Sequence, residues 1–241
     1  MINNLSVFAL IPARGGSRRI PKKNIRKLAG KPLVCYSIEE AKKSRYIDRL
    51  ILSSDDAEIV SIAQENGCDA PFIRPQKFAG DDVTDFPVFV HALKWLEEHE
   101  SYIPDIVVQL RPTSPLRTAD QIDAAIELLA RHSEADSVRT VAEPEQSPYK
   151  MYRIGNAGYL EPLLQPEGEE EPFNLPNAKL PKAYKHVGYV DVMWRSTIME
   201  KGQMTGKKVL PLFLEEAYSG INTQQDWEYY EFLIEKKRKK N

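Results

Sequence analysis

The stretch that decides the fold lies near the start of the chain, at Val7–Ser17 (VFALIPARGGS). Its first five residues, Val7 to Ile11, are all apolar, which is the pattern of a strand covered on both faces in a parallel sheet. A basic loop follows at once. Pro32 to Ser44 then carries apolar residues at helical spacing, and Arg49 to Ser53 is a second apolar run. The sequence therefore predicts a βαβ unit.

The same alternation continues along the chain. We expect helices near Asp56 to Asn66 (ended by Gly67), Asp85 to His99, Ala119 to His132 and Thr223 to Lys237. The expected strands are Phe72–Ile73, Asp105 to Leu110, Asp136 to Val141, Val187 to Met193 and Val209 to Phe213. This order predicts an α/β fold with a doubly wound, mostly parallel sheet and loops gathered at the carboxyl ends of its strands.

Composition limits the classes of protein. The chain has 241 residues, of which 42% are hydrophobic and 28% charged, so we expect one globular domain over residues 1–241. A net charge of −2 gives no basic field for nucleic acid. No leader pattern begins the chain and no apolar stretch is long enough to span a bilayer, so we expect a cytoplasmic protein without a membrane partner. Cys35 and Cys68 are expected in the core, and the four histidines lack zinc-site spacing.

The α/β pattern is interrupted over about residues 143–185. Seven prolines divide this segment into short extended pieces, and its acidic run, Glu167 to Glu171, has no apolar period. We interpret the segment as an inserted arm that packs against a second copy of the protein in a homodimer. A mobile surface loop is the alternative.

The densest chemical signal is the loop from Arg14 to Asn24. It places five cations within ten residues, together with Gly15 and Gly16, at the end of a buried strand. Such a loop is an anion cradle at the edge of the sheet where α/β proteins bind ligands, and a triphosphate is the expected guest. The chain has neither a GxGxxG fingerprint nor a GxxxxGK[ST] loop, which disfavours a nicotinamide dehydrogenase and a P-loop protein.

Several stretches together resemble one family. Leu10–Ser17 with Pro21 and Lys23–Asn24 is similar to the nucleotide-binding signature of the acylneuraminate (CMP-sialic acid, or nonulosonic acid) cytidylyltransferases. Further similar stretches follow in the expected order at Arg74–Pro75, Ala79–Asp81, Arg111–Arg117 and Leu180–Tyr184. The resemblance implies a Rossmann-like nucleotidyltransferase. Its members join CTP to an acidic 2-keto sugar, giving a CMP-sugar and pyrophosphate with Mg²⁺ or Mn²⁺ as cofactor.

The resemblance also implies roles for individual residues. Arg14 and Lys23 would be catalytic, because they would neutralise charge on the phosphates. The implied nucleotide-binding residues are Ala13, Arg14, Gly15, Gly16, Ser17, Lys23, Asn24, Arg74 and Asp81. The implied sugar-binding residues are Arg111, Thr113, Ser114, Lys150 and Gly188. An arginine at 111, where the family often has glutamine, offers a bidentate partner for a sugar carboxylate. Thr118 with Gln121 is expected to be only a capping box.

Three departures from the family pattern alter the expected sugar and metal sites. Gly220-Ile221-Asn222-Thr223 stands where the family usually has Asp-x-Asp-Thr, so Asn222 is either a weak metal ligand or the N-cap of the last helix with Gln225. Val187 replaces an asparagine, and Asn177–Ala178 replaces an Arg-Gln pair. Asp191 is either a replacement metal ligand or a solvated carboxylate. The alternatives are an enzyme for an octulosonic acid such as Kdo or for another nucleotide, and a degenerate nucleotide-binding protein.

Overall fold

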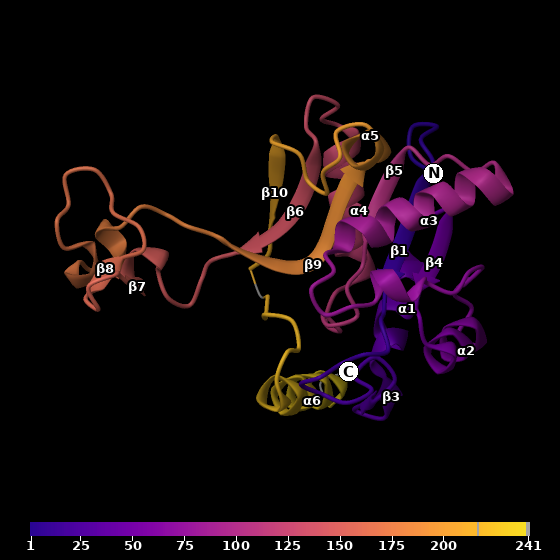
Figure 1. The fold of residues 1–241 in the computed structure, drawn as a ribbon, viewed down its shortest axis with the longest axis horizontal. Coiled ribbons are helices and arrows are strands. Elements are labelled where there is room, and N and C mark those ends of the chain that lie inside the picture. Colours follow the sequence, from indigo (N-terminus) through magenta and orange to yellow (C-terminus); the bar gives the residue numbers. More distant parts are fainter. Residues whose placement is uncertain (216, 240–241) are drawn as a thin grey trace.

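The structure is a computed structural model that describes residues 1–215 and 217–239. Within these residues the centre is a six-stranded sheet in the order β10-β6-β9-β5-β1-β4 (Figure 1). Its strands are β1 (Val7–Pro12), β4 (Arg49–Ser53), β5 (Ile106–Gln109), β6 (Ser137–Ala142), β9 (Lys185–Trp194) and β10 (Val209–Phe213). Within this sheet, as far as the described residues form it, only β9 runs antiparallel to its neighbours, β5 and β6. The prediction of a mostly parallel sheet is confirmed.

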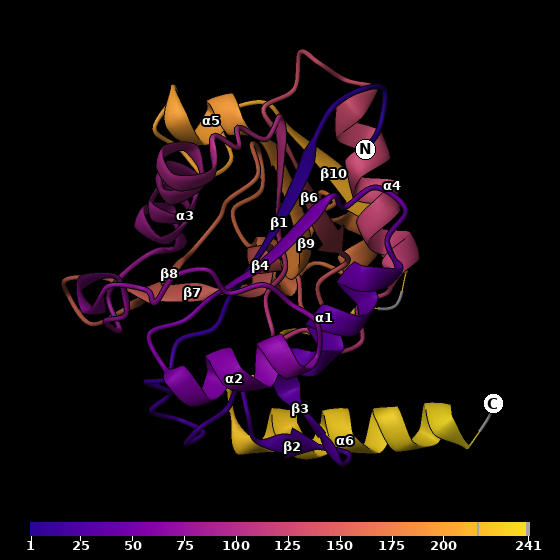
Figure 2. The ribbon, with the colours of Figure 1, turned by 90° about the vertical axis from the view of Figure 1, so that its right-hand side faces the viewer.

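Helices cover both faces of the sheet, as a doubly wound fold requires (Figure 2). One face carries α1 (Leu33–Lys43), α2 (Ala57–Glu65) and α4 (Ala119–Ala130), and the other carries α3 (Asp85–Glu100) and α5 (Arg195–Met199). Two apolar cores result, one beneath each helix layer. Cys35 and Cys68 are both buried in the first core as free thiols, as expected.

One predicted strand is absent. Phe72 and Ile73, both within the described part of the chain, form no strand, and a single bridge between Ile51 and Asp69 takes their place beside β4. Pro71 precedes them and has no backbone N–H to donate to a ladder, which is the physical reason. Phe72 is buried instead against α3, where its ring meets His91 edge-on with the centroids 4.9 Å apart.

The caps of two helices test the sequence interpretation. The Thr118–Gln121 capping box of α4 is confirmed. For α6 (Gln224–Arg238) the predicted cap was one residue early, because Thr223 and not Asn222 is the N-cap. The Thr223 hydroxyl accepts from the Asp226 N–H, and the Asp226 carboxylate accepts from the N–H groups of both Asn222 and Thr223. A charged carboxylate is a stronger acceptor than the Gln225 amide, so the box forms at 223 and 226.

Helix α6 lies beside a small hairpin of β2 (Lys27–Leu28) and β3 (Lys31–Pro32), as Figure 2 shows. A third apolar cluster joins them, in which Trp227 and Ile221 pack with Leu28. The Arg26 guanidinium lies 4.5 Å from the centre of the Trp227 ring. The last helix therefore braces the loop that follows β1.

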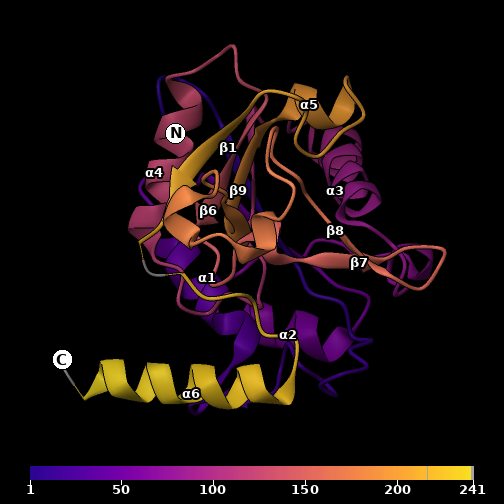
Figure 3. The same cartoon turned by 90° about the vertical axis from the view of Figure 1, so that its left-hand side faces the viewer.

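The chain from residue 143 to 184 leaves the sheet after β6 and returns at β9. It carries a short hairpin, β7 (Tyr152–Ile154) with β8 (Leu160–Pro162), and the 3₁₀ turns Pro148–Lys150, Pro172–Asn174 and Asn177–Lys179. A further 3₁₀ turn lies at Gln76–Phe78, outside this segment. Figure 1 shows the segment projecting away from the sheet, and Figure 3 views the molecule from the side on which it projects. Across residues 1–215 and 217–239, none of the helices has both the length and the apolar character needed to cross a membrane.

Candidate active site

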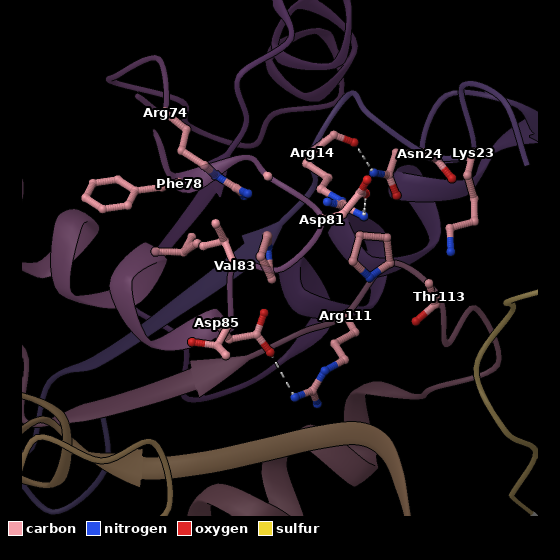
Figure 4. A pocket seen from close by; sticks show the side chains of 16 residues that line it. Arg14, Lys23, Asn24, Arg74, Phe78, Asp81, Val83, Asp85, Arg111 and Thr113 are labelled. Carbon is pink, nitrogen blue, oxygen red and sulfur yellow. Dashed lines mark hydrogen bonds and ion pairs between the residues drawn. The ribbon is translucent and has the colours of Figure 1, made fainter. Parts of the chain in front are cut away.

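A pocket of about 290 Å³ opens at the carboxyl ends of β1 and β5, beside the start of α3 (Figure 4). This is the edge where α/β sheets bind ligands. Its walls are formed by Pro12, Arg14, Ser17, Lys23, Asn24, Arg74, Phe78, Gly80, Asp81, Val83, Thr84, Asp85, Val88, Arg111, Pro112 and Thr113. The pocket therefore brings the basic loop after β1 together with the loop after β5.

The basic loop is pressed against the start of α2. The N–H of Gly15 donates to Asp55 Oδ1 at 2.9 Å, and a β-carbon at position 15 would lie 2.7 Å from Asp56 Oδ2. Asp56 is itself fixed as the N-cap of α2. Only glycine fits this close approach. Gly16, in contrast, faces open space among the described residues.

Arg14 is held in place over the pocket by its neighbours. Its Nη2 lies 2.6 Å from Asp81 Oδ1, and Arg18 pairs with the other oxygen of the same carboxylate. The Asn24 amide donates to the Arg14 carbonyl at 2.9 Å. Figure 4 shows Arg14, Asp81 and Asn24 grouped at one end of the pocket. The cation is thus oriented before any ligand arrives.

Two further cations, Lys23 and Arg74, line the same cavity. Lys23 Nζ donates to the carbonyl of Ile221 at 2.9 Å, and burial together with the charges of Arg14 and Arg19 holds the pKa of Lys23 below its ordinary value. Arg74 is 4% exposed and its Nε donates to Ser53 Oγ at 3.0 Å. Burial lowers the pKa of Arg74 to about 10. Concentrated positive charge with restricted solvation suits a polyphosphate.

Arg111 lies at the opposite end of the pocket from Arg14 and Arg74 (Figure 4). Its guanidinium is already shared by two carboxylates: Nη1 lies 2.7 Å from Asp191 Oδ2, and Nη2 lies 3.2 Å from Asp85 Oδ2. Gln109 Oε1 accepts a third bond at 3.0 Å. The sequence predicts that Arg111 is a bidentate partner for a sugar carboxylate. The structure places Arg111 in the pocket wall, where its guanidinium already takes part in an ion-pair network.

Asp191 is fully buried in that network. The prediction that it could be a solvated carboxylate is therefore wrong. Burial alone would raise its pKa, but the hydrogen bond from His186 and the charge of Arg111 outweigh burial, so the pKa of Asp191 lies below its ordinary value. One oxygen meets His186 and the other Arg111. Both oxygens of Asp191 are therefore engaged by protein side chains.

The remaining predicted residues lie at different places relative to the pocket. Ser17 and Thr113 line the pocket. Ala13 is buried behind it, and Ser114 is a buried structural contact whose Oγ donates to the Gly188 carbonyl at 3.2 Å. Lys150 lies on the projecting segment, outside this pocket. Gly188 packs beside Arg111, because a β-carbon at 188 would be 3.5 Å from Arg111 Nη1.

The donor set does not fit a resident metal ion. The described ranges contain no group of three histidine, cysteine or acidic side chains arranged to hold one. The pocket carboxylates Asp81 and Asp85 are each paired with arginine. The Asn222 amide is exposed, and its nitrogen donates to the Gly220 carbonyl at 3.0 Å.

Sequence reasoning missed three contributors to this site. Asp85 was interpreted only as the start of a helix, yet it lines the pocket and pairs with Arg111. Arg117 is buried beneath the same loop, and its Nη1 donates to the Tyr189 carbonyl at 2.6 Å. Burial lowers the pKa of Arg117 to about 9. His186 was considered only as one of four histidines without zinc-site spacing. Nothing in the local sequence indicates these contacts, because each depends on which strands are adjacent.

Comparisons with known proteins agree with this architecture. Over 120 residues the chain is 43% identical to a pseudaminic acid cytidylyltransferase of Campylobacter jejuni, in a match that covers 50% of this chain and 51% of that protein; the chain thus spans about half the length of that relative. It is 29% identical to a CMP-N,N'-diacetyllegionaminic acid synthase of Legionella pneumophila, over 96% of this chain and 97% of that protein.

Among solved structures, a CMP:2-keto-3-deoxy-manno-octonic acid synthetase complexed with CTP has the same fold, with a TM-score of 0.71 at 16% identity. That likeness covers 96% of this chain and 99% of the other. Residues 8–219 match the cytidylyltransferase family model, which takes in the basic loop, the loop after β5 and the projecting segment. The chain therefore belongs to the cytidylyltransferase family.

Proposed function

We propose that the protein transfers the cytidylyl group of CTP to the anomeric hydroxyl of a nonulosonic acid, an acidic 2-keto sugar, and releases pyrophosphate. The observation that carries this proposal is the single pocket in which Arg14, Lys23 and Arg74 face a polar end formed by Arg111 and Thr113. The named relatives that act on pseudaminic and diacetyllegionaminic acids support the class of sugar.

The arrangement suits the charge changes of such a transfer. Negative charge grows on the α-phosphate oxygens and on the leaving pyrophosphate, so cations fixed in advance lower the barrier. Arg14 is oriented by Asp81 and Lys23 by the Ile221 carbonyl. We assign these two cations to transition-state stabilisation, and Ser17, Asn24 and Arg74 to holding the nucleotide.

We further propose that Mg²⁺, or Mn²⁺, enters bound to the triphosphate as part of the substrate. The reason is the donor set, because both pocket carboxylates are already paired with arginine. Mg²⁺ commonly keeps several waters and takes phosphate oxygens with few protein ligands. No step is assigned to a metal ion held by the protein alone.

We also propose that the protein is a homodimer in the cytoplasm. The segment 143–184 carries large apolar side chains that a single copy leaves exposed, among them Ile154 and Tyr159, each 76% exposed. Such side chains favour an interface over free solvation. Lys150 belongs to this segment, so we propose that it reaches the sugar from a neighbouring copy.

The test is pyrophosphate release with CTP, Mg²⁺ and a panel of acids: pseudaminic, N,N'-diacetyllegionaminic, N-acylneuraminic and Kdo. We expect turnover with a nonulosonic acid and a preference for CTP over ATP, GTP and UTP at equal concentration. Turnover only with Kdo, or no preference for CTP, would overturn the substrate assignment. CTP binding without turnover across the panel would instead support a degenerate nucleotide-binding protein.

A further inference from the structure

A bulge in β9 brings two distant residues together. His186 and Asp191 are five positions apart, and in a regular strand an odd spacing places side chains on opposite faces. Gly188, between them, has a left-handed φ of +69°, and the pairing of β9 with β6 shifts register between Arg139 and Val141. Five residue steps on β9, from Asp191 to His186, face only two on β6, from Arg139 to Val141. This irregularity brings His186 to the side of Asp191, and His186 Nε2 lies 2.8 Å from Asp191 Oδ1.

Asp191 fixes the orientation and the tautomer of this histidine. Its carboxylate is fully buried, and its second oxygen is held by Arg111 Nη1 at 2.7 Å. Arg139 Nε lies farther off, 3.8 Å from Oδ1. When Nε2–H donates to a carboxylate, the neutral ring presents Nδ1 as a proton acceptor. Within residues 1–215 and 217–239, no protein group occupies Nδ1 of His186.

The topology places His186 beside Arg111, a residue of the pocket wall, although His186 itself is not among the lining residues. Because β9 is antiparallel to β5, its amino end lies where β1 and β5 have their carboxyl ends. His186 Cε1 lies 3.9 Å, and Arg111 Nη1 3.5 Å, from the point that a β-carbon on Gly188 would occupy. Arg111 lines the pocket. The His186 side chain is 34% exposed, whereas Val187 beside it is buried.

The transfer needs an acceptor for one proton, and the carboxylates of the pocket already serve other groups. Asp81 pairs with Arg14 and Arg18 through both oxygens, and Asp85 Oδ2 accepts from both Arg111 and Gln109. Lys23 and Arg14 are needed as cations at the phosphates. A carboxylate-oriented imidazole is the arrangement by which proteins remove a hydroxyl proton during nucleophilic attack.

We propose that His186, oriented by Asp191, is the general base that accepts the proton of the sugar's anomeric hydroxyl. This inference rests on the proposed function. The anomeric oxygen forms a bond to the α-phosphorus while the bond from that phosphorus to the bridging oxygen of pyrophosphate breaks, and pyrophosphate leaves with the electron pair. The hydroxyl proton passes to His186 Nδ1. Asp191 stabilises the resulting imidazolium, which returns the proton to solvent through its exposed edge.

The experiment compares the parent protein with His186→Ala, His186→Gln and the control His132→Ala, which removes a partly exposed histidine from the turn after α4. We expect kcat for pyrophosphate release to fall about 10²- to 10⁴-fold in both His186 variants. The KM for CTP should remain unchanged in the His186 variants. The His132→Ala variant should keep the parent kcat and KM. His186→Gln keeps an N–H donor for Asp191 but has no basic nitrogen, so it separates packing from proton transfer.

Chemical rescue distinguishes the outcomes further. Added imidazole should restore part of the lost kcat in His186→Ala and should not stimulate the parent. Asp191→Asn should lower kcat with His186 still present. Near-parent kcat in His186→Gln, or a loss in His186→Ala that imidazole does not relieve, would overturn the assignment. If the parent itself releases no pyrophosphate with any acid of the panel, the proposed function fails first, and the two failures are thereby distinguished.

Discussion

Gly220 lies directly against Thr113, so that a β-carbon at position 220 would be 3.0 Å from the Thr113 hydroxyl oxygen. The N–H of the next residue, Ile221, donates to the Thr113 carbonyl at 2.9 Å. The loop before α6 is thereby fastened to the loop after β5. Ile221 also offers the carbonyl that orients Lys23. A side chain at position 220 would therefore require Thr113 to shift at the pocket rim.

Introducing a carboxylate at position 220 should lower the stability of the protein and weaken its binding of CTP. We expect Gly220→Asp to lower the free energy of unfolding by about 1 to 3 kcal/mol through overpacking. Since it moves Ile221, it should also raise the KM for CTP. Thermal unfolding and initial rates measure both effects. Gly220→Ala should cost less in a Thr113→Ala background than alone, because the hydroxyl is removed. A Gly220→Asp protein with parent stability and parent KM would contradict this account.

Removing either fixed cation should abolish most of the turnover. We expect Arg14→Ala and Lys23→Ala each to lower kcat/KM for CTP about 10²- to 10³-fold, the scale for one preorganised electrostatic contact. The matched control is Lys22→Ala in the same loop, because Lys22 is exposed and pairs only with Glu58 on α2 among the described residues. Rates of pyrophosphate release measure all three. Persistent turnover in both pocket variants would remove the proposed roles.

The charge of Lys23 should set the alkaline limit of activity. Burial and the neighbouring Arg14 and Arg19 lower its pKa, so Lys23 loses its proton at a lower pH than an ordinary lysine. Activity with CTP should therefore fall as pH rises through this lowered pKa. Lys23→Arg keeps its charge at these pH values and should move the decline to higher pH, even if the maximal rate drops. An unchanged alkaline limb in Lys23→Arg would exclude Lys23 as its cause.

The layers of this fold, and the basic loop on one side of its candidate site, could be predicted from the sequence. The uninterrupted apolar run at Val7–Ile11 is typical of a strand buried on both faces, and the strands at 49–53 and 209–213 agree with the predicted ranges to the residue. The loop that holds Arg14 and Lys23 could be predicted as an anion cradle because it is contiguous in sequence and follows that strand directly, and the family resemblance singled out these two residues.

The other side of the site could not be predicted in the same way. The Asp85–Arg111–Asp191–His186 network joins α3, the loop after β5 and β9, and its formation depends on strand order and on a bulge at Gly188. A bulge changes which side chains share a face, and the sequence around a single glycine does not reveal it. The cap at Thr223 was misplaced for a related reason, since Asn222 and Thr223 both match a capping pattern and only the carboxylate of Asp226 decides.

Asn222 should prove irrelevant to the metal requirement. Its amide is exposed and bonded to the Gly220 carbonyl, and the cap of α6 uses Thr223 instead. We expect chelation of divalent ions to stop turnover in the parent, and Asn222→Ala to need the same Mg²⁺ concentration for half-maximal rate. Thr223→Ala, in contrast, should lower stability by about 1 kcal/mol through loss of the cap. A marked rise in the Mg²⁺ requirement of Asn222→Ala would restore it as a ligand.

The projecting segment should be the dimer contact. Its exposed apolar side chains lie on both strands of the β7–β8 hairpin and on the turn between them, with Ile154 and Leu160 paired across the hairpin at 76% and 65% exposure. Stable interfaces bury about 800 Å² per partner around such apolar side chains, and a charge at the centre is strongly disfavoured. We expect a dimer in sedimentation velocity, and a shift to monomer in Ile154→Asp and Leu160→Asp. Phe232→Asp on α6, also an exposed apolar position, is the matched control and should remain dimeric. A parent that sediments as a monomer, or dimers that survive both hairpin substitutions, would return the segment to a surface loop and leave Lys150 without a route to the sugar.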